Sequence, residues 1–305
     1  MVTLEHIDAG SVQVRRAVPD PAASPLDLDE AAIEQRIRST SASFFWSMRL
    51  LPGPRRKAIQ ALYVFCREVG DIADGEGSRT LKLQLLADWR DQIALLYAGR
   101  PQHLVARALR DAIERFDLRC EDFLAIIDGV KIDLSADIRA PSLEQLDLYF
   151  EQTTVAASRI ALRIFGAAPS DANRVAAPLG RGMQLTGILR DLAHDAARHR
   201  LYLPRELLRA HGIFATMPSY VSAQPALPRV CNALAERAAV HFTEAERAIG
   251  ARPIWAALAT AAVLSSYRKL LKALVTRGWT RLDEPVHIPA WRQTVLLIGQ
   301  GPTGR

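Results

Sequence analysis

The 305-residue sequence predicts an all-α protein that folds as a single helical domain. Apolar residues recur at spacings of three and four over most of the chain, which is the period of a helix with one buried face. The alternation typical of strands and the residue pairs of hairpin turns are scarce. No internal repeat and no linker divides the chain, so a single core is expected.

Six segments carry this helical spacing, and the runs between them contain proline or glycine, which interrupt helices. These runs are PGP at 52–54 and, further along, AGRPQ, RAPS, GAAPSD and SAQPALP. The first helix is predicted directly after PGP, from Arg55 to Asp74. The other five are predicted at 80–98, 143–165, 172–195, 229–249 and 255–276.

The two ends of the chain are predicted to lie outside this domain. Residues 1–28 are rich in Pro, Ala, Ser and Asp, a composition that favours a disordered arm. The helical domain would then occupy residues 29–297, and residues 298–305 would form a short tail. The first twenty residues lack the apolar core of a signal peptide, and the longest apolar stretch, 254–264, is too short to span a bilayer.

Charge and cysteine content narrow the classes of partner. A net charge of +6 and a pI near 9.5 favour a phosphorylated small molecule or an anionic membrane surface. Nucleic acid is not expected, because no run rich in Lys and Arg is interleaved with aromatic residues. Three widely separated cysteines argue against disulfides or a zinc site. A cytoplasmic protein is predicted, with peripheral association to the inner membrane face as an alternative.

Two of the predicted helices each carry a polar stripe that contains an acidic pair. The first stripe consists of Tyr63, Arg67, Gly70, Asp71 and Asp74. The second consists of Gln184, Gly187, Asp191, His194 and Asp195. Residues three or four apart share one helix face, so facing helices could hold Mg²⁺ ions between their carboxylates and a diphosphate.

A solvated helix face is the alternative interpretation of each stripe. Arg67 would then be an ordinary partner of Asp71 four residues away. The glycines argue against this interpretation, because a mid-helix glycine costs about 1 kcal/mol relative to alanine and tends to mark a close approach. Zinc is not predicted, since His194 and His199 lack the H-E-x-x-H arrangement.

Longer segments around both stripes resemble signature sequences of the squalene/phytoene synthase family. SASFFWSMRLLPGPRRKAIQALYVFCREVGDIAD and GMQLTGILRDLAHDAARHRLYLP resemble its two motifs. DFLAIIDGVKIDLSADIRAPSLEQLDLYFEQ and ALRIFG are most similar to bacterial presqualene diphosphate synthases of hopanoid pathways. The resemblance spans about residues 35–290. It implies the isoprenoid synthase fold, with a central cavity, and a prenyltransferase that joins two farnesyl diphosphates head to head into presqualene diphosphate.

The resemblance also assigns roles to single residues. The catalytic residues it implies are Tyr63, Asp71, Asp74, Asp191 and Asp195, of which the four aspartates are also the metal ligands. The substrate-binding residues it implies are Ser41, Ser43, Arg67, Gln184, Arg190, Arg200, Tyr202 and Tyr267. Asp133 matches a further acid on an intervening helix. Mg²⁺ is the implied cofactor, with Mn²⁺ as an alternative. No NADPH site is expected, because GEG and GRG do not follow strands.

Three positions depart from the family pattern on the two polar stripes. The family usually has Asp at Gly70, Asn at Gly187 and Glu at His194, and Ser158 replaces a glycine where substrate chains pass. These changes predict a metal site that has lost ligands, hence weakened metal binding.

A non-catalytic homologue that serves as a binding or assembly module is the rival hypothesis. A chain-elongating synthase or terpene cyclase is disfavoured by the two motifs. Enzymes downstream in the squalene pathway are the expected protein partners.

Overall fold

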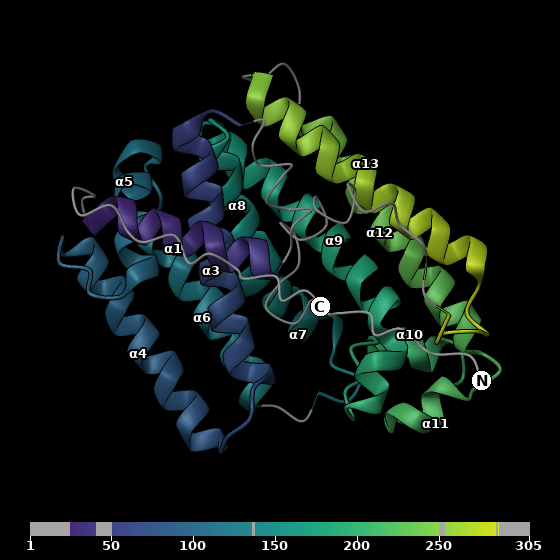
Figure 1. The fold of residues 1–305 in the computed structure, drawn as a ribbon. Helices are drawn as coiled ribbons and strands as arrows, with labels where there is room; N and C mark the ends of the chain where they lie inside the picture. Colours follow the sequence, from purple (N-terminus) through teal and green to yellow (C-terminus); the bar gives the residue numbers. More distant parts are fainter. Residues whose placement is uncertain (1–24, 41–50, 136–137, 250–253, 285, 287–305) are drawn as a thin grey trace, which may run out of the picture.

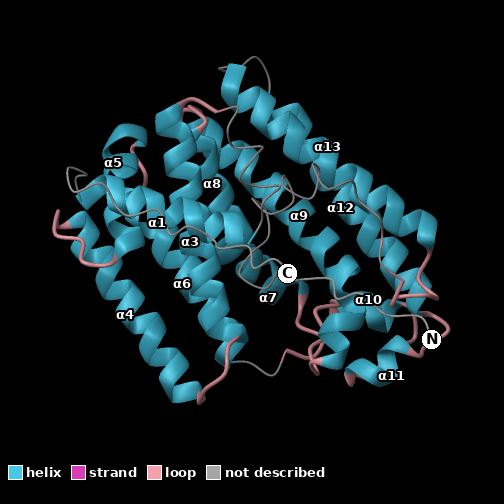
Figure 2. Ribbon diagram, in the orientation of Figure 1, coloured by secondary structure: helices cyan, strands magenta, loops and turns pink. Residues whose placement is uncertain are grey.

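The computed structural model describes residues 25–40, 51–135, 138–249, 254–284 and 286. These ranges form a helical assembly around one core, without a strand among them (Figure 1, Figure 2). The one extended contact in this part of the chain is an isolated bridge between Arg139 and Leu201. The all-α prediction is therefore confirmed.

Helix bounds agree with the predicted segments to within a few residues where a prediction was made. The elements are α1 Pro25–Thr40, α3 Gly53–Asp74, α4 Arg79–Tyr97, α5 Leu104–Phe116, α6 Cys120–Ser135, α7 Leu143–Phe150, the π-helix η1 Glu151–Val155, α8 Ala156–Ile164, α9 Pro169–Ala197, α10 Arg205–Ala210, α11 Pro218–Ser222, α12 Leu227–Ile249 and α13 Ile254–Arg277.

Two differences from the sequence analysis concern α1 and the segment 143–165. Helix α1 begins at Pro25, inside the arm predicted for residues 1–28, and its residues Ile33 and Ile37 are buried in the core. The helix predicted over 143–165 is a continuous helical run in which one π-helical turn, η1, separates α7 from α8. The predicted outer limits of the domain, including the tail at 298–305, lie outside the described residues and stay a prediction.

Helix α9 lies at the centre of the fold, against α8 and η1 on one side and α12 on the other (Figure 1). Two glycines permit this close packing. A Cβ on Gly180 would lie 2.9 Å from the Val155 backbone nitrogen, and one on Gly182 would lie 2.7 Å from the Phe242 ring. The close approach fixes α9 against its neighbours and so positions the polar residues near its end. None of the described helices is long and apolar enough to cross a membrane.

Candidate functional site

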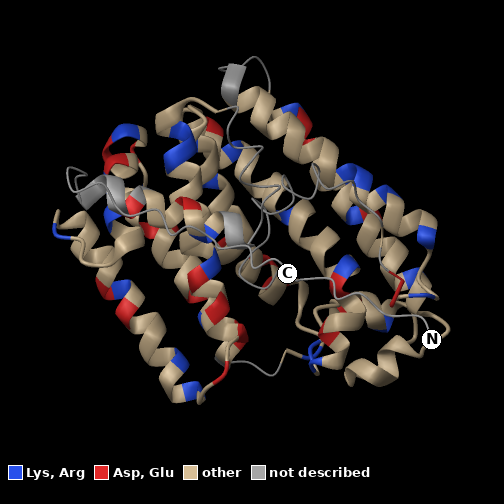
Figure 3. Ribbon diagram, viewed as in Figure 1, with Lys and Arg blue, Asp and Glu red and all other residues tan. Residues whose placement is uncertain are grey.

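Part of each predicted polar stripe lies near the point where α3 and α9 end. Figure 3 shows acidic positions at the end of α3 and charged positions of both signs on the later part of α9. Four carboxylates, here called the carboxylate cluster, come from three helices: Asp74 on α3, Asp133 on α6, and Asp191 and Asp195 on α9. Three arginines accompany them, and these are Arg190, Arg198 and Arg200.

Asp74 is the last residue of α3, and its enclosed side chain forms ion pairs with the loop after α9. Its side chain is 4% exposed, and its Oδ1 lies 3.2 Å from Nη2 of Arg198 and 3.7 Å from Nη1 of Arg200. Neither contact has hydrogen-bond geometry, so this buried oxygen accepts no hydrogen bond from the described residues. A buried acceptor of this kind is costly unless a donor or a cation satisfies it.

Asp133 is held by two tyrosines. The Tyr149 hydroxyl donates to its Oδ2 over 3.1 Å, and the Tyr202 hydroxyl donates to its Oδ1 over 3.0 Å. Burial raises the pKa of Asp133 to about 6, although the charge of Arg200 and the two hydroxyls oppose this. The two tyrosine rings stack, with centroids 5.8 Å apart, and both line a cavity of about 280 Å³.

The pair on α9 is divided into two different environments. Arg190 donates to Asp191 through Nε and Nη2, over 2.7 and 2.5 Å, which makes a bidentate pair. Asp195, one turn later, is half-buried beside it. Burial and the charge of Asp191 raise the pKa of Asp195 to about 7. The buried Tyr267 of α13 lies close enough to feel the charges of Arg190 and Asp191, and burial raises the pKa of its hydroxyl.

The polar stripe of α3 is split by the structure. Asp74 joins the carboxylate cluster, whereas Asp71 accepts from Nε of Arg67 over 3.3 Å on its own helix, with half of its side chain exposed. This is the arrangement that the solvated-face interpretation predicts. Tyr63 lies near both charges, and burial raises the pKa of its hydroxyl. The roles of Tyr63, Arg67 and Asp71 stay predictions.

The remaining predicted residues lie on α9, in the loop after it, or outside the described residues. Gln184 on α9 accepts from the Thr154 hydroxyl of η1 over 2.6 Å, which ties the second stripe to the π-helix. Tyr202 contacts Asp133 as described above, and Arg200 lies within range of the charges of Asp74, Asp133 and Asp195. Ser41 and Ser43 lie outside the described residues.

Comparison with known proteins places this chain in a family. Residues 37–292 match the model of the squalene/phytoene synthase family. The chain belongs to this family. It is 41% identical over 269 residues to a presqualene diphosphate synthase of Rhodopseudomonas palustris, covering 88% of this chain and 96% of that protein. It is 32% identical to a phytoene synthase of Thermus thermophilus, covering 89% and 92% of the two chains.

Solved structures agree with this family fold. A squalene synthase from Alicyclobacillus acidocaldarius superposes with a TM-score of 0.75 at 22% identity, covering 85% of this chain and 96% of that chain. A dehydrosqualene synthase in complex with a ligand gives a TM-score of 0.74 at 24% identity, covering 90% and 96%. The predicted isoprenoid synthase fold is thus confirmed for this squalene/phytoene synthase family member.

The carboxylate cluster fits a divalent cation by donor type and charge. Carboxylate oxygens are the ligands that Mg²⁺ prefers, and the hydrogen-bond-free oxygen of Asp74 is a buried example. A side chain at Gly187 would meet nothing within 4 Å, so space lies beside Asp191. Among the described residues, however, no three His, Cys, Asp or Glu side chains are arranged closely enough to hold a metal ion. Arginines are the present partners of Asp74 and Asp191.

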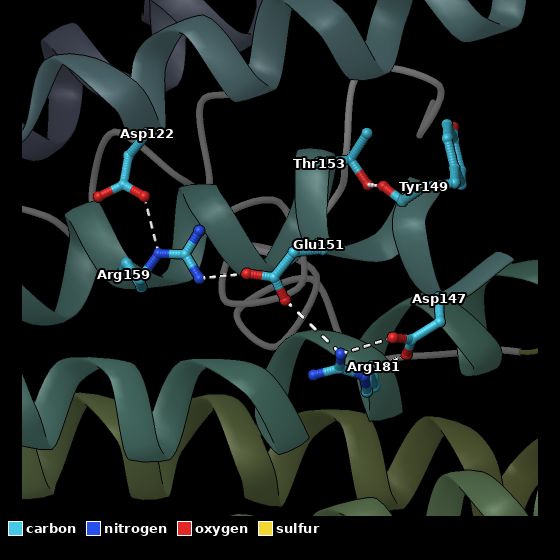
Figure 4. A network of polar contacts seen from close by, with 7 residues as sticks. All are labelled: Asp122, Asp147, Tyr149, Glu151, Thr153, Arg159 and Arg181. Carbon is cyan, nitrogen blue, oxygen red and sulfur yellow. Dashed lines mark hydrogen bonds and ion pairs between the residues drawn. The ribbon is translucent and has the colours of Figure 1, made fainter. Parts of the chain in front are cut away.

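Two features of the site were not predicted from the sequence. Tyr149 and Arg198 contact the carboxylate cluster, but no spacing along the chain marks them. The π-helix is braced by an ion-pair network, in which Arg159 joins Glu151 to Asp122 on α6 and Arg181 on α9 joins Glu151 to Asp147 on α7 (Figure 4). Since Tyr149 and Thr154 flank Glu151, this network fixes the groups that contact Asp133 and Gln184.

Proposed function

We propose that this prenyltransferase joins two farnesyl diphosphates head to head to form presqualene diphosphate. Family membership and 41% identity to proteins named presqualene diphosphate synthase support the reaction. The observation that carries the proposal is the carboxylate cluster with its three arginines, a combination suited to a cation and a diphosphate. Mg²⁺ or Mn²⁺ is the proposed cofactor.

We also propose that the protein works in the cytoplasm, at the inner membrane face, and passes its product to downstream enzymes of the squalene pathway.

The acidic and basic residues of the site have different proposed roles. Asp74, Asp191 and Asp195 would hold the cation once drawn closer together than they are in the described structure. The bound cation would supply positive charge to the departing diphosphate. Arg190 and Arg200 would orient the diphosphate, because the planar fork of arginine matches phosphate oxygens. Closure of the cyclopropane releases a proton. Asp133, buried between two tyrosine hydroxyls with a pKa of about 6, suits a group that holds a proton near neutral pH.

Incubation of the purified protein with farnesyl diphosphate and Mg²⁺ tests this function. We expect a C30 diphosphate, identified by mass spectrometry, together with release of inorganic diphosphate. A protein that binds farnesyl diphosphate but yields no C30 product with either Mg²⁺ or Mn²⁺ would refute the proposal. That result would favour the non-catalytic binding or assembly module.

Weakened metal binding is tested by Gly187→Asn. The substituted side chain enters open space on the α9 face that carries Asp191, and it adds an oxygen where the family usually has one. We expect the Mg²⁺ concentration for half-maximal activity to fall by roughly fivefold, about 1 kcal/mol of metal affinity. Gly53→Asn is the matched control, because Gly53 also has open space around it but lies at the start of α3. Equal Mg²⁺ requirements for the parent and Gly187→Asn would contradict a lost ligand at this position.

The raised pKa of Asp195 predicts a pH-dependent stability in the metal-free protein. Its carboxyl titrates near pH 4 when unfolded and at about 7 when folded, so the folded state holds the extra proton between these values. Stability should therefore fall as the pH rises from about 4 to about 7. Over this window the parent should lose on the order of 3 kcal/mol more than Asp195→Asn, measured by urea unfolding with a chelator present. Parallel curves for the two proteins would show that its surroundings do not raise the pKa of Asp195.

A further inference from the structure

Three large apolar side chains project from residues 214–220, which cover the end of the loop after α10 and the first part of α11. Phe214 is 77% exposed, Met217 58% and Tyr220 57%. We call them the apolar ridge. Scattered apolar side chains on a surface are ordinary, but three large ones gathered on one short segment indicate an interaction site. The short helix α11 between Pro218 and Ser222 carries no charged position and is uniformly tan in Figure 3.

The ridge is held firmly by residues of the same segment that point inward. Ile213 and Val221 are buried, at 3% and 0% exposure. The Ile213 amide donates to the Leu208 carbonyl over 2.9 Å, and the Val221 amide donates to the Met217 carbonyl over 3.0 Å. The exposed side chains therefore project because their neighbours are anchored in the core. A rigid apolar projection can enter an apolar phase without first paying to order the segment.

The charged residues that neighbour the ridge in the sequence are all basic. Between Glu206 and Glu236 the sequence contains no Asp or Glu. Arg209 precedes the ridge and Arg229 follows it, and both are exposed. His211 adds a third group that can carry positive charge. Asp283, from the segment after α13, lines a pocket together with Ser219 and Ser222, so the basic character belongs to the segment 207–235 itself. Apolar and aromatic side chains flanked by arginines on one segment are complementary to the interface of an anionic bilayer.

We propose that the apolar ridge and its flanking arginines dock this protein on the surface of an anionic phospholipid bilayer. The contact would place Phe214, Met217 and Tyr220 at the depth of the lipid headgroups, where the amphipathic ring of tyrosine is favoured. A protein partner is a poorer fit, because a stable interface buries about 800 Å² on each side, more than three side chains supply.

The position of the ridge connects it to the candidate site. Arg198, Arg200 and Tyr202, which contact the carboxylate cluster, lie directly before α10, and the ridge lies directly after it. Docking would thus bring this side of the site toward the bilayer. The purpose of that approach rests on the proposed function, because a C30 product is lipid-like, whereas the contact itself does not depend on it.

Vesicle sedimentation with the full-length protein tests the proposal. The probes are vesicles of phosphatidylcholine mixed with phosphatidylglycerol, and vesicles of phosphatidylcholine alone. The variant Phe214→Ser/Met217→Ser/Tyr220→Ser should partition to the mixed vesicles at least about tenfold less than the parent, because apolar burial is lost. The matched control is Leu81→Ser/Val240→Ser/Leu258→Ser, whose native side chains are 52%, 56% and 56% exposed. This control should bind as the parent does.

Three further variants test the charged and the apolar component of the contact separately. Arg209→Glu/Arg229→Glu should lower binding to mixed vesicles and leave the weaker binding to phosphatidylcholine nearly unchanged. The tryptophan emission of Phe214→Trp should shift to shorter wavelength on mixed vesicles, and that of Val240→Trp should not. These single substitutions at exposed positions keep the test valid if the triple variant folds poorly.

Several results would overturn the proposal. They are a parent that does not bind mixed vesicles, a triple variant that binds as well as its control, and an unshifted emission of Phe214→Trp. Loss of self-association in the triple variant, with vesicle binding intact, would assign the ridge to a second copy of the chain. Vesicle binding by a protein that makes no C30 product would refute the proposed function and leave the bilayer contact standing.

Discussion

Asp74→Asn is expected to lower the rate of C30 product formation by about a thousandfold while the protein stays folded. Asp74 is the buried carboxylate at the end of α3, and its Oδ1 accepts no hydrogen bond from the described residues. The substitution keeps the size of the side chain but removes its charge, hence one proposed ligand of the cation. Because Arg198 and Arg200 keep partial contact with solvent, the melting temperature should fall by only a few degrees.

The control for this experiment is Asp128→Asn. Asp128 on α6 pairs with Nη1 of Arg90 over 2.6 Å, at a site where both side chains are about two-fifths exposed. Its loss changes the net charge by the same amount, away from the carboxylate cluster. Turnover is measured with saturating farnesyl diphosphate over a range of Mg²⁺ concentrations. A parental rate in Asp74→Asn at low Mg²⁺ would remove Asp74 from the proposed metal site.

The spacing of apolar residues in the sequence was sufficient to predict the long helices but not the short ones. Helices α3, α9 and α12 each turn a buried stripe inward over many residues, so the helical period is legible in the sequence. Helices α10 and α11 have six and five residues, fewer than two turns, so no period can be read from them. Helix α1 begins inside a segment whose average composition resembles a disordered arm.

The π-helix could not be predicted, because its cause lies in another part of the chain. A Cβ at Gly129 would lie 2.4 Å from the Thr153 side chain, and one at Gly180 would lie 2.9 Å from the Val155 backbone. The turn of η1 is thus fitted between α6 and α9. The sequence 143–165 carries an ordinary helical period, and a single extra residue in one turn does not alter it visibly.

Spacing along a helix predicted Asp74, Asp191 and Asp195 of the carboxylate cluster but not their partners, and Asp133 came only from the family resemblance. Asp191 and Asp195 share one face of α9 as predicted, and both belong to the carboxylate cluster. Asp71 and Asp74 also share a face by spacing, yet Asp71 contacts Arg67 while Asp74 contacts Arg198. Which of two acids turns toward another element depends on tertiary packing. The same holds for Tyr149, which reaches Asp133 from a different helix.

Loss of an arginine of the site is the second change for which we expect a large effect, here on diphosphate binding. Arg200→Ala should weaken the binding of inorganic diphosphate by about thirtyfold, ~2 kcal/mol, because charge-assisted hydrogen bonds to phosphate oxygens are lost. Arg200 suits this role better than Arg190, whose fork is already engaged by Asp191. Arg200 lies 3.7 Å from Asp74 and within range of the charges of Asp133 and Asp195.

Loss of Arg200 should also have an effect that a merely structural arginine would not produce. Its charge lowers the pKa of both Asp133 and Asp195, so Arg200→Ala should raise both pKa values further and shift the pH dependence of turnover upward. Calorimetric titration with diphosphate and Mg²⁺ measures the affinity, and a pH–rate profile measures the shift. Arg90→Ala, which removes the surface partner of Asp128, should change neither quantity. Equal affinities for Arg200→Ala and the parent would exclude Arg200 from the diphosphate site. An altered affinity without a shifted profile would show that Arg200 does not influence the pKa of Asp133 or Asp195.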